Sequence, residues 1–362
     1  MRRGILTVAA VGLLTAGSLT ACGNDSSGAA GRPKPKIGVI LPDSASSNRW
    51  ETADRRYLEA AFKAAGVDYD IQNAQNDKAR FVTIAEQMIT NGVTALMITN
   101  LDSGTGKAVL DKATQKGVAT IDYDRPTLGG SAQYYVSFDN VAVGRLQGEG
   151  LVKCLTDKGI KTPVIAELNG SPTDNNAVQF KEGYDSVLQP RYDSKQYRKG
   201  PDQSVPEWNN TTGGTIFEQM LTQTNGRIDA VVAANDGLAN AVISVLAKNK
   251  LNGKVPVTGQ DADAQALQHI LSGDQCMTVY KPVRTEAEAA ADLAIALARG
   301  ERKKTEQSFR DPKGNRNVPA VLLGAQAITK ETVQNVIADS YVDKADVCTA
   351  KYAALCAQAG ID

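Results

Sequence analysis

Short apolar runs alternate with amphipathic stretches along most of the chain, and this alternation constrains the fold more than any other feature. The stretch near residues 50–65, and the one that places Phe81, Ile84 and Met88 on one face, predict helices. Strand-like runs flank them, among them IGVIL, TALMITN, YYVSF, PVIAELNG and IDAVVAAND. The alternation predicts an α/β fold of mostly parallel sheets with helices on both faces.

The length of the alternation favours two such lobes over one very wide sheet. With 362 residues, of which 42% are hydrophobic, the chain has enough apolar residues to fill a core in each lobe.

The stretch 255–282 has the clearest pattern, because two apolar runs, VPVTG and CMTVY, each end abruptly in polar residues or proline. The residues between them predict a helix, since four apolar side chains share one face: Ala266, Leu267, Ile270 and Leu271. Ligands of α/β sheets bind at the carboxyl ends of strands. We therefore predict that Asp261 and Lys281 are pocket residues.

Polar clusters follow other strands in the same way: SNRW, YDRP, SPTDNNA, PEW and ANDG. Helix capping explains the Asp, Asn and Ser side chains in about half of them. It does not explain the arginines, Trp208 or Lys281. An Arg fork can bridge two hydroxyls, Asp and Asn supply paired acceptors and donors, and an indole offers a flat apolar face. This mixture predicts a neutral ring rich in hydroxyls as the ligand.

Charge and composition argue against several function classes. Forty basic residues balance forty acidic ones, so there is no net charge to favour nucleic acid as a partner. His269 is the single histidine, which argues against His-rich metal sites and against Ser-His-Asp or Cys-His catalysis. The stretches SGTGKA and DADAQA lack required positions of a phosphate loop and of a calcium loop. We expect no metal and no cofactor.

The N-terminus has the pattern of a secretory signal: Arg2 and Arg3 precede an apolar run from Ile5 to Leu14. The following LTAC resembles the lipobox of bacterial lipoproteins, in which the cysteine is acylated and becomes the mature N-terminus. We expect a lipoprotein signal peptide at residues 1–21, acylation of Cys22 and a flexible tether at 22–35. The mature protein would then be anchored by lipid to the outer face of the cytoplasmic membrane.

Four further cysteines in an oxidising compartment predict two disulfides: Cys154, Cys276, Cys348 and Cys356. The segment CTAKYAALC has a helical pattern, and eight residues of helix would separate its two cysteines by about 12 Å. Long-range pairs are therefore favoured over Cys348 with Cys356. The connectivity stays open, with four buried free thiols as the alternative.

From Lys36 to about Ala338 the chain resembles the type I periplasmic binding proteins of ABC sugar importers, most of all the xylose-binding branch. The resemblance lies in motifs that occur in the same order: KIGVIL, RWETADR, YDRP, YYVSFDN with VGRLQG, GSPTDNNA, DQSVPEW, IDAVVAANDG, NGKVPVTGQDAD and QCMTVYKP. It implies two Rossmann-like lobes joined by three crossing segments, with a sugar enclosed between them.

The resemblance also divides the chain and names the sugar contacts. The N-terminal lobe would comprise 36–138 and 282–318, and the C-terminal lobe 139–281 and 319–362, with the tail helices packed on the C-terminal lobe. The implied sugar-binding residues are Arg49, Asp124, Arg125, Asp174, Asn176, Trp208, Asn235, Asp261 and Lys281.

The function implied is that of a monomeric, non-catalytic receptor that delivers a monosaccharide, D-xylose first, to an ABC permease. Glucose, galactose or arabinose as the ligand, and a role as a sensor for a chemoreceptor or kinase, are alternatives. A glycosidase with Asp261 and Asp263 as its two carboxylates is an enzyme alternative, but Asp263 is expected to cap a helix. A sugar-responsive repressor would need a DNA-binding helix pair where this chain has a signal peptide.

The lipid anchor can be tested at Cys22. Acyl chains contribute about 0.8 kcal/mol per buried methylene to membrane attachment, and a Cys22→Ala chain has no thiol to carry them. We expect this variant to accumulate as unprocessed precursor on immunoblots of membrane fractions. Recovery of a normally processed, membrane-bound Cys22→Ala protein would contradict the assignment.

Overall fold

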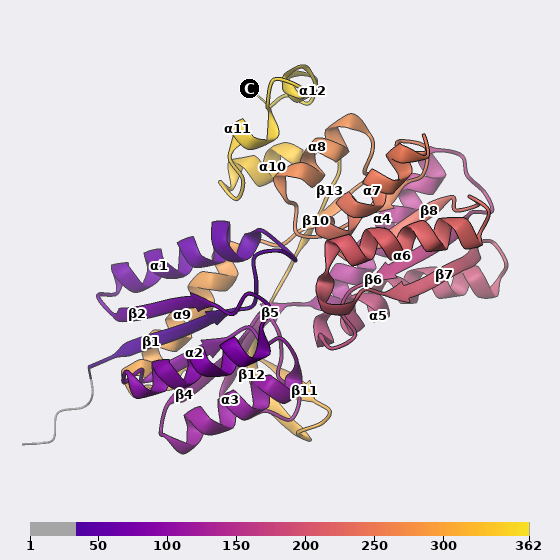
Figure 1. The fold of residues 1–362 in the computed structure, drawn as a ribbon. Coiled ribbons are helices and arrows are strands. Elements are labelled where there is room, and N and C mark those ends of the chain that lie inside the picture. Colours follow the sequence, from indigo (N-terminus) through magenta and orange to yellow (C-terminus); the bar gives the residue numbers. More distant parts are fainter. Residues whose placement is uncertain (1–33, 362) are drawn as a thin grey trace, which may run out of the picture. The chain divides into compact units, whose positions relative to one another are not determined.

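The computed structural model describes residues 34–361, so the predicted signal peptide and Cys22 lie outside the described residues. The N-terminal part is built on a seven-stranded sheet in the order β11-β12-β5-β4-β3-β1-β2 (Figure 1). Its strands are β1 (Lys36–Leu41), β2 (Asp68–Asn73), β3 (Ala95–Ile98), β4 (Ala119–Tyr123), β5 (Tyr134–Phe138), β11 (Gln307–Asp311) and β12 (Arg316–Leu323). All neighbours are parallel except β11 and β12, which form an antiparallel pair.

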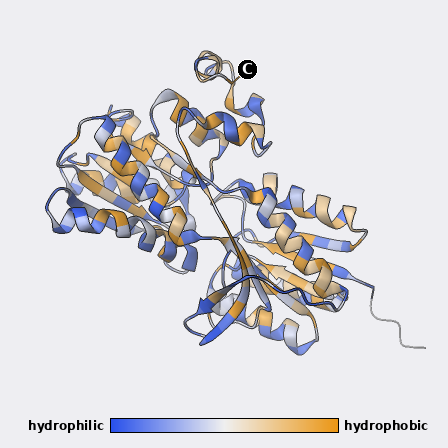
Figure 2. Cartoon of the chain, turned by 180° about the vertical axis from the view of Figure 1, so that it is seen from behind, coloured by the Kyte–Doolittle hydropathy of each residue, from blue (hydrophilic) through white to orange (hydrophobic). Residues whose placement is uncertain are grey.

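Helices cover both faces of this sheet because its strands are apolar on both sides. Val39 and Met97 face one core together with Phe62 and Leu293, whereas Ile40 and its neighbours face another core. The helices are α1 (Arg55–Ala64), which continues the π-helical turn η1 (Trp50–Asp54), α2 (Lys78–Thr90), α3 (Ser103–Gln115) and α9 (Val283–Ala298). Figure 2 shows the hydrophobic residues concentrated on the strands and on the helix faces turned toward them.

The C-terminal part has a four-stranded parallel sheet in the order β7-β6-β8-β9. Its strands are β6 (Val164–Asn169), β7 (Arg198–Ser204), β8 (Ala230–Ala233) and β9 (Val257–Thr258), and its helices are α4 (Asn140–Asp157), α5 (Asn175–Asp193), α6 (Asn210–Gln223), α7 (Asp236–Lys248) and α8 (Ala264–Ser272). Helices α4 and α5 approach very closely, since a Cβ on Gly144 would lie 2.0 Å from the Phe180 carbonyl oxygen. The predicted α/β class of two helix-covered sheets is confirmed.

Three segments run between the two sheets. The first follows β5, the second follows β10 (Thr278–Tyr280), and the third lies between β12 and β13 (Gln326–Ile328), which pairs with β10. We predicted the third crossing near Val318. It comes later, because residues 320–323 pair in parallel with 135–138 of β5 and thereby extend the first sheet.

The C-terminal tail contains α10 (Val333–Ala338), α11 (Lys344–Val347) and α12 (Ala353–Gln358). It contacts α8, as predicted, where the Gln268 side-chain amide donates to the Asp346 carbonyl at 2.7 Å. It also contacts the N-terminal lobe, since the Ser340 carbonyl accepts from Arg56 at 3.0 Å and from Tyr57 at 3.1 Å. The tail therefore touches elements of both lobes, which the sequence did not predict.

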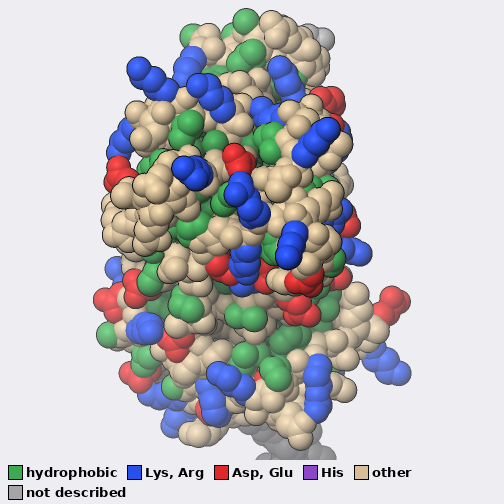
Figure 3. Space-filling model, turned by 90° about the vertical axis from the view of Figure 1, so that its right-hand side faces the viewer, with side chains coloured by type: hydrophobic (Ala, Val, Ile, Leu, Met, Phe, Trp, Pro, Cys, Tyr) green, Lys and Arg blue, Asp and Glu red, His purple; other side chains and the backbone are tan. Residues whose placement is uncertain are grey.

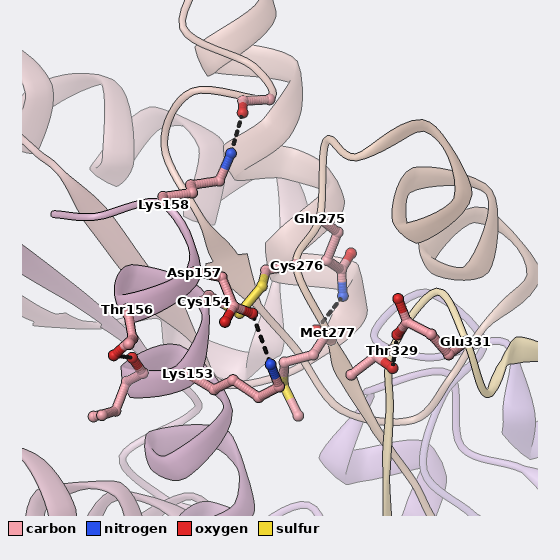
Figure 4. The surroundings of a disulfide bond; sticks show 12 residues. Lys153, Cys154, Thr156, Asp157, Lys158, Gln275, Cys276, Met277, Thr329 and Glu331 are labelled. Carbon is pink, nitrogen blue, oxygen red and sulfur yellow. Dashed lines mark hydrogen bonds and ion pairs between the residues drawn. A yellow bond between two sulfur atoms is a disulfide. The ribbon is translucent and has the colours of Figure 1, made fainter.

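The four cysteines form two disulfides, Cys154–Cys276 and Cys348–Cys356. The first joins α4 to the segment that precedes β10 (Figure 4). The expectation against the second pair is wrong, because the helical pattern is broken. Helix α11 ends at Val347, α12 begins at Ala353, and the turn between them brings the two Cα atoms to 5.9 Å.

Within residues 34–361, no helix is long and apolar enough to span a bilayer. On the face seen in Figure 3, lysines and arginines are scattered singly among acidic and uncharged side chains. This mixture matches the equal numbers of basic and acidic residues in the chain.

The disulfide pairing can be checked by peptide mapping of non-reduced protein. Lys351 lies between Cys348 and Cys356, so trypsin releases their peptides separately and only a disulfide keeps them together. We expect this linked pair and a second one that joins the peptides of Cys154 and Cys276. Linkage of Cys154 or Cys276 to the tail, or alkylation of all four thiols without reduction, would contradict the structure.

Candidate functional site

One cavity lies where the carboxyl ends of strands from both sheets meet, and we call it the interlobe cavity. All nine residues implied by the sequence line it: Arg49, Asp124, Arg125, Asp174, Asn176, Trp208, Asn235, Asp261 and Lys281. Five more residues complete the lining: Ser46, Ser47, Trp50, Phe180 and Gln260. The structure thus brings the nine residues together, and their part in ligand binding stays a prediction.

Arg49 precedes the first turn of η1, and its side chain is buried in a set of carboxylates. It is paired with Asp54 at 2.8 Å, with Glu286 at 2.7 Å and with Asp124 at 3.0 Å, and its guanidinium lies 4.5 Å from the Trp50 ring centroid. Burial by itself raises the pKa of Asp124, but the nearby cations, Arg49 first among them, lower that pKa below its ordinary value. Asp124 is therefore an ionised acceptor.

Asp124 follows β4 in a left-handed conformation with φ 62°, which is strained for a residue other than glycine. Its carbonyl accepts from the hydroxyls of Tyr135 at 3.1 Å and Ser137 at 2.7 Å. Both donors come from the neighbouring strand β5. Bonds from an adjacent strand hold the strained turn that directs Asp124 and Arg125 into the cavity.

The C-terminal lobe contributes Asp174 and Asn176 from the start of α5. Asp174 caps that helix and accepts from the Trp208 indole and from the Arg125 Nε, both at 3.0 Å. Asn176 donates to the carbonyl of Asp124 at 3.0 Å and to its carboxylate at 3.1 Å. Direct bonds thus join side chains of the two lobes across the cavity.

Trp208 ends the short 3₁₀ turn η2 (Pro206–Trp208) with φ 56°. Its ring lies over Gly170, where a Cβ would come within 2.0 Å of the indole, so only glycine fits beneath it. Phe180 meets the indole edge to face, with 6.5 Å between ring centroids. These rings form an apolar wall beside the charged groups.

Asp261 follows β9 and has φ 109°. Its carboxylate is paired with Lys281 at 3.0 Å and accepts from the Ser47 hydroxyl at 3.1 Å. The predicted cap is confirmed, since Asp263 accepts from the Ala266 amide at 2.7 Å at the start of α8. The two neighbouring carboxylates therefore have different roles: Asp261 lines the cavity, and Asp263 caps α8.

Asn235 combines both kinds of interaction. Its side-chain oxygen caps α7 by accepting from the Leu238 amide at 2.9 Å, and its amide nitrogen donates to the Ser46 carbonyl at 3.2 Å. Beneath it, the buried Asp236 accepts from the amide of Asp263 at 3.1 Å. Burial, with the charges of Asp263 and Asp261 adding to it, raises the pKa of Asp236 well above its ordinary value.

Four buried polar atoms in the cavity lining have no hydrogen-bond partner among the described residues: Trp50 Nε1, Asn176 Oδ1, Gln260 Oε1 and Asp261 Oδ1, the last of which is in ion-pair contact with Lys281. Leaving such a group unpaired costs about 1 to 3 kcal/mol. One donor and three acceptors suit a ligand with hydroxyl groups, which donate and accept. The arrangement points to a polar, uncharged ligand.

The interlobe cavity has a volume of about 30 Å³, which is room for one or two water molecules. A larger ligand must therefore displace the bonds that join the lobes. A wider surface pocket of about 970 Å³ is lined by residues of α6, α7 and α8 but by none of the nine predicted residues. We assign the site to the smaller cavity because the buried ion pairs and strained turns lie there.

Sequence reasoning missed Ser46, Ser47, Trp50, Phe180 and Gln260. Trp50 and Gln260 each adjoin a selected residue, so a wider window around Arg49 and Asp261 would have included them. Phe180 lies four residues after Asn176 on α5, and helical spacing could have placed it on the same face. The serines lie in a stretch with no periodic pattern.

The comparisons with known proteins identify the family of the chain. The family model described as periplasmic binding protein domain matches residues 37–302. The D-xylose-binding periplasmic protein of Escherichia coli is 33% identical over 302 residues, which cover 83% of this chain and 89% of that protein. The protein of the same name from Haemophilus influenzae is 34% identical over 313 residues, with coverages of 86% and 92%.

A similar solved structure is the carbohydrate transporter solute binding protein from Chloroflexus aurantiacus in complex with D-glucose. It is 28% identical, superposes with a TM-score of 0.78, and covers 86% of this chain and 97% of its own. A family model that matches most of the chain, relatives above 30% identity and a shared two-lobed structure lead to one conclusion. The chain belongs to the periplasmic binding protein family, as its resemblance to that family predicted.

Proposed function

We propose that this chain is a lipid-anchored, extracytoplasmic solute-binding protein that captures a monosaccharide in the interlobe cavity and delivers it to an ABC permease. The observation that carries the proposal is the lining of that cavity. It combines buried ion pairs, aromatic rings and the unpartnered atoms Trp50 Nε1, Asn176 Oδ1 and Gln260 Oε1.

The chemistry of the lining suits a sugar. Carboxylates held by cations, such as Asp261 beside Lys281 and Asp174 beside Arg125, are fixed acceptors for hydroxyl groups. Amides such as Asn176 both donate and accept, and the rings of Trp208 and Phe180 offer an apolar surface to the C–H bonds of a sugar ring. Side chains of both lobes would contact one ligand, which couples its binding to movement about the three crossing segments.

D-xylose is the sugar that we propose, because relatives at 33% and 34% identity are D-xylose-binding periplasmic proteins. D-glucose is the nearest alternative, since the similar Chloroflexus aurantiacus structure contains it. A glycosidase is not supported by the carboxylates first considered for it. Asp263 is committed to capping α8, and Asp261 is paired with Lys281.

Calorimetric titration with a panel of pentoses and hexoses tests the function. The panel contains D-xylose, D-glucose, D-galactose and L-arabinose. We expect saturable one-to-one binding with D-xylose tightest, and unchanged sugar by chromatography after prolonged incubation. A protein that binds none of these sugars would refute the proposal, and a tighter hexose would correct the choice of sugar.

Asp261→Ala tests the site. Each hydrogen bond to a charged group contributes about 1.5 to 3 kcal/mol, so the loss of two should weaken sugar affinity by roughly two to four powers of ten. Asp263→Ala is the matched control: losing the α8 cap should lower stability by about 1 kcal/mol and leave affinity unchanged. Titration and thermal unfolding of both variants decide the matter. Parental affinity in Asp261→Ala would move the site elsewhere.

A further inference from the structure

A cluster of buried charge lies directly behind the interlobe cavity. It consists of Arg49, Asp54, Glu286 and the hydroxyl of Tyr123, which donates to Asp54 at 2.6 Å. Glu286 and Asp54 are fully buried, and neither lines the cavity. Glu286 is also the one charged residue among the buried residues of α9, which are otherwise alanine, valine and leucine.

Burial of a carboxyl group in so apolar a helix is unfavourable unless a partner compensates it. Its partner is Arg49, whose Nη2 donates to Glu286 Oε2 at 2.7 Å. The other carboxyl oxygen, Oε1, has no partner among the described residues. Among the described residues, Arg49 is therefore the only hydrogen-bond partner of the Glu286 carboxyl group.

The hydrogen bonds of Arg49 account for four of the five N–H groups of a guanidinium. Nε donates to Asp54 at 2.9 Å, and Nη2 donates both to Asp54 at 2.8 Å and to Glu286. Nη1 donates once, to Asp124 at 3.0 Å. The second N–H of Nη1 is left without a partner among residues 34–361, and Nη1 is the nitrogen that already bonds a cavity residue.

The two carboxyl groups hold different edges of the guanidinium, and the Trp50 ring covers one of its faces at 4.5 Å. Burial, reinforced by Asp124 and Asp54, raises the pKa of Glu286 well above its ordinary value even though Arg49 opposes the shift. Glutamine keeps an acceptor oxygen for Arg49 Nη2 on a side chain of the same length, whereas methionine has similar length and no comparable acceptor.

We propose that Glu286 is a positioning residue, which turns the remaining N–H of Arg49 toward a hydroxyl group of the bound monosaccharide. The inference rests on the proposed sugar-binding function and deepens it, because it assigns one hydroxyl of the ligand to one nitrogen of Arg49. Glu286 acts through Arg49 and does not touch the sugar.

The test compares Glu286→Met with Glu286→Gln, and Glu288→Ala on the exposed side of the same helix is the control. Each protein is titrated with D-xylose and with its monodeoxy analogues, and its melting temperature is recorded. We expect Glu286→Met to bind D-xylose about 10- to 100-fold more weakly, while Glu286→Gln and Glu288→Ala bind like the parent.

The deoxy analogues separate positioning from a general structural role. One deoxy analogue lacks the hydroxyl that Arg49 contacts, and the parent should bind it as weakly as Glu286→Met binds D-xylose. For that analogue Glu286→Met should weaken binding no further. Equal losses for D-xylose and every analogue would overturn the inference and leave the sugar-binding function standing. A folded Glu286→Gln with weakened binding would overturn it too, even if Glu286→Met does not fold. A parent that binds no sugar would overturn both proposals.

Discussion

Buried charge at the carboxyl ends of the strands is the constraint on which the rest of this structure depends. Arg49, Arg125 and Lys281 are all nearly inaccessible to solvent, and so are the carboxylates that face them. A buried charge without a partner is strongly destabilising, so each cation must have a carboxylate in place. Two of these pairs, Arg49 with Glu286 and Arg125 with Asp174, bring together side chains from distant parts of the chain.

Backbone strain is also present at this place. Asp124, Trp208 and Asp261 all have positive φ values, and each follows a strand end or a short turn that lines the cavity. Such conformations persist only where their surroundings hold them. Hydroxyls of β5 hold Asp124, Gly170 leaves space for Trp208, and the Val279 carbonyl accepts from the Asp261 amide at 2.9 Å. The scaffold maintains the site at the expense of local strain.

The disulfides and the tail reinforce the elements that carry the site. Cys154–Cys276 ties α4 to the segment that leads through β10 to Lys281. The tail, closed by Cys348–Cys356, contacts α8, which begins directly after Asp263. Its Ser340 carbonyl also accepts from Tyr57 of α1, so it is linked to both lobes. The cavity is thus buttressed from several sides of the fold.

The sequence by itself determined the class of the fold, because that class depends on local patterns. Periodicity placed the strands and helices, and the rule that ligands bind at strand ends selected Asp261 and Lys281. The resemblance to the periplasmic binding proteins implied the other seven residues that share their cavity. Tertiary structure alone decided which neighbouring residues joined them. Glu286 and Glu288 lie two positions apart on α9, and only the packing of that helix makes one a buried partner of Arg49 and leaves the other exposed.

The Cys348–Cys356 bridge depended likewise on a break between α11 and α12 that helical periodicity does not reveal. The third crossing moved beyond β12 because strand pairing with β5 is a contact between residues far apart in the chain. Local patterns specify what each segment can form, whereas burial and pairing between distant segments arise only when the segments pack together.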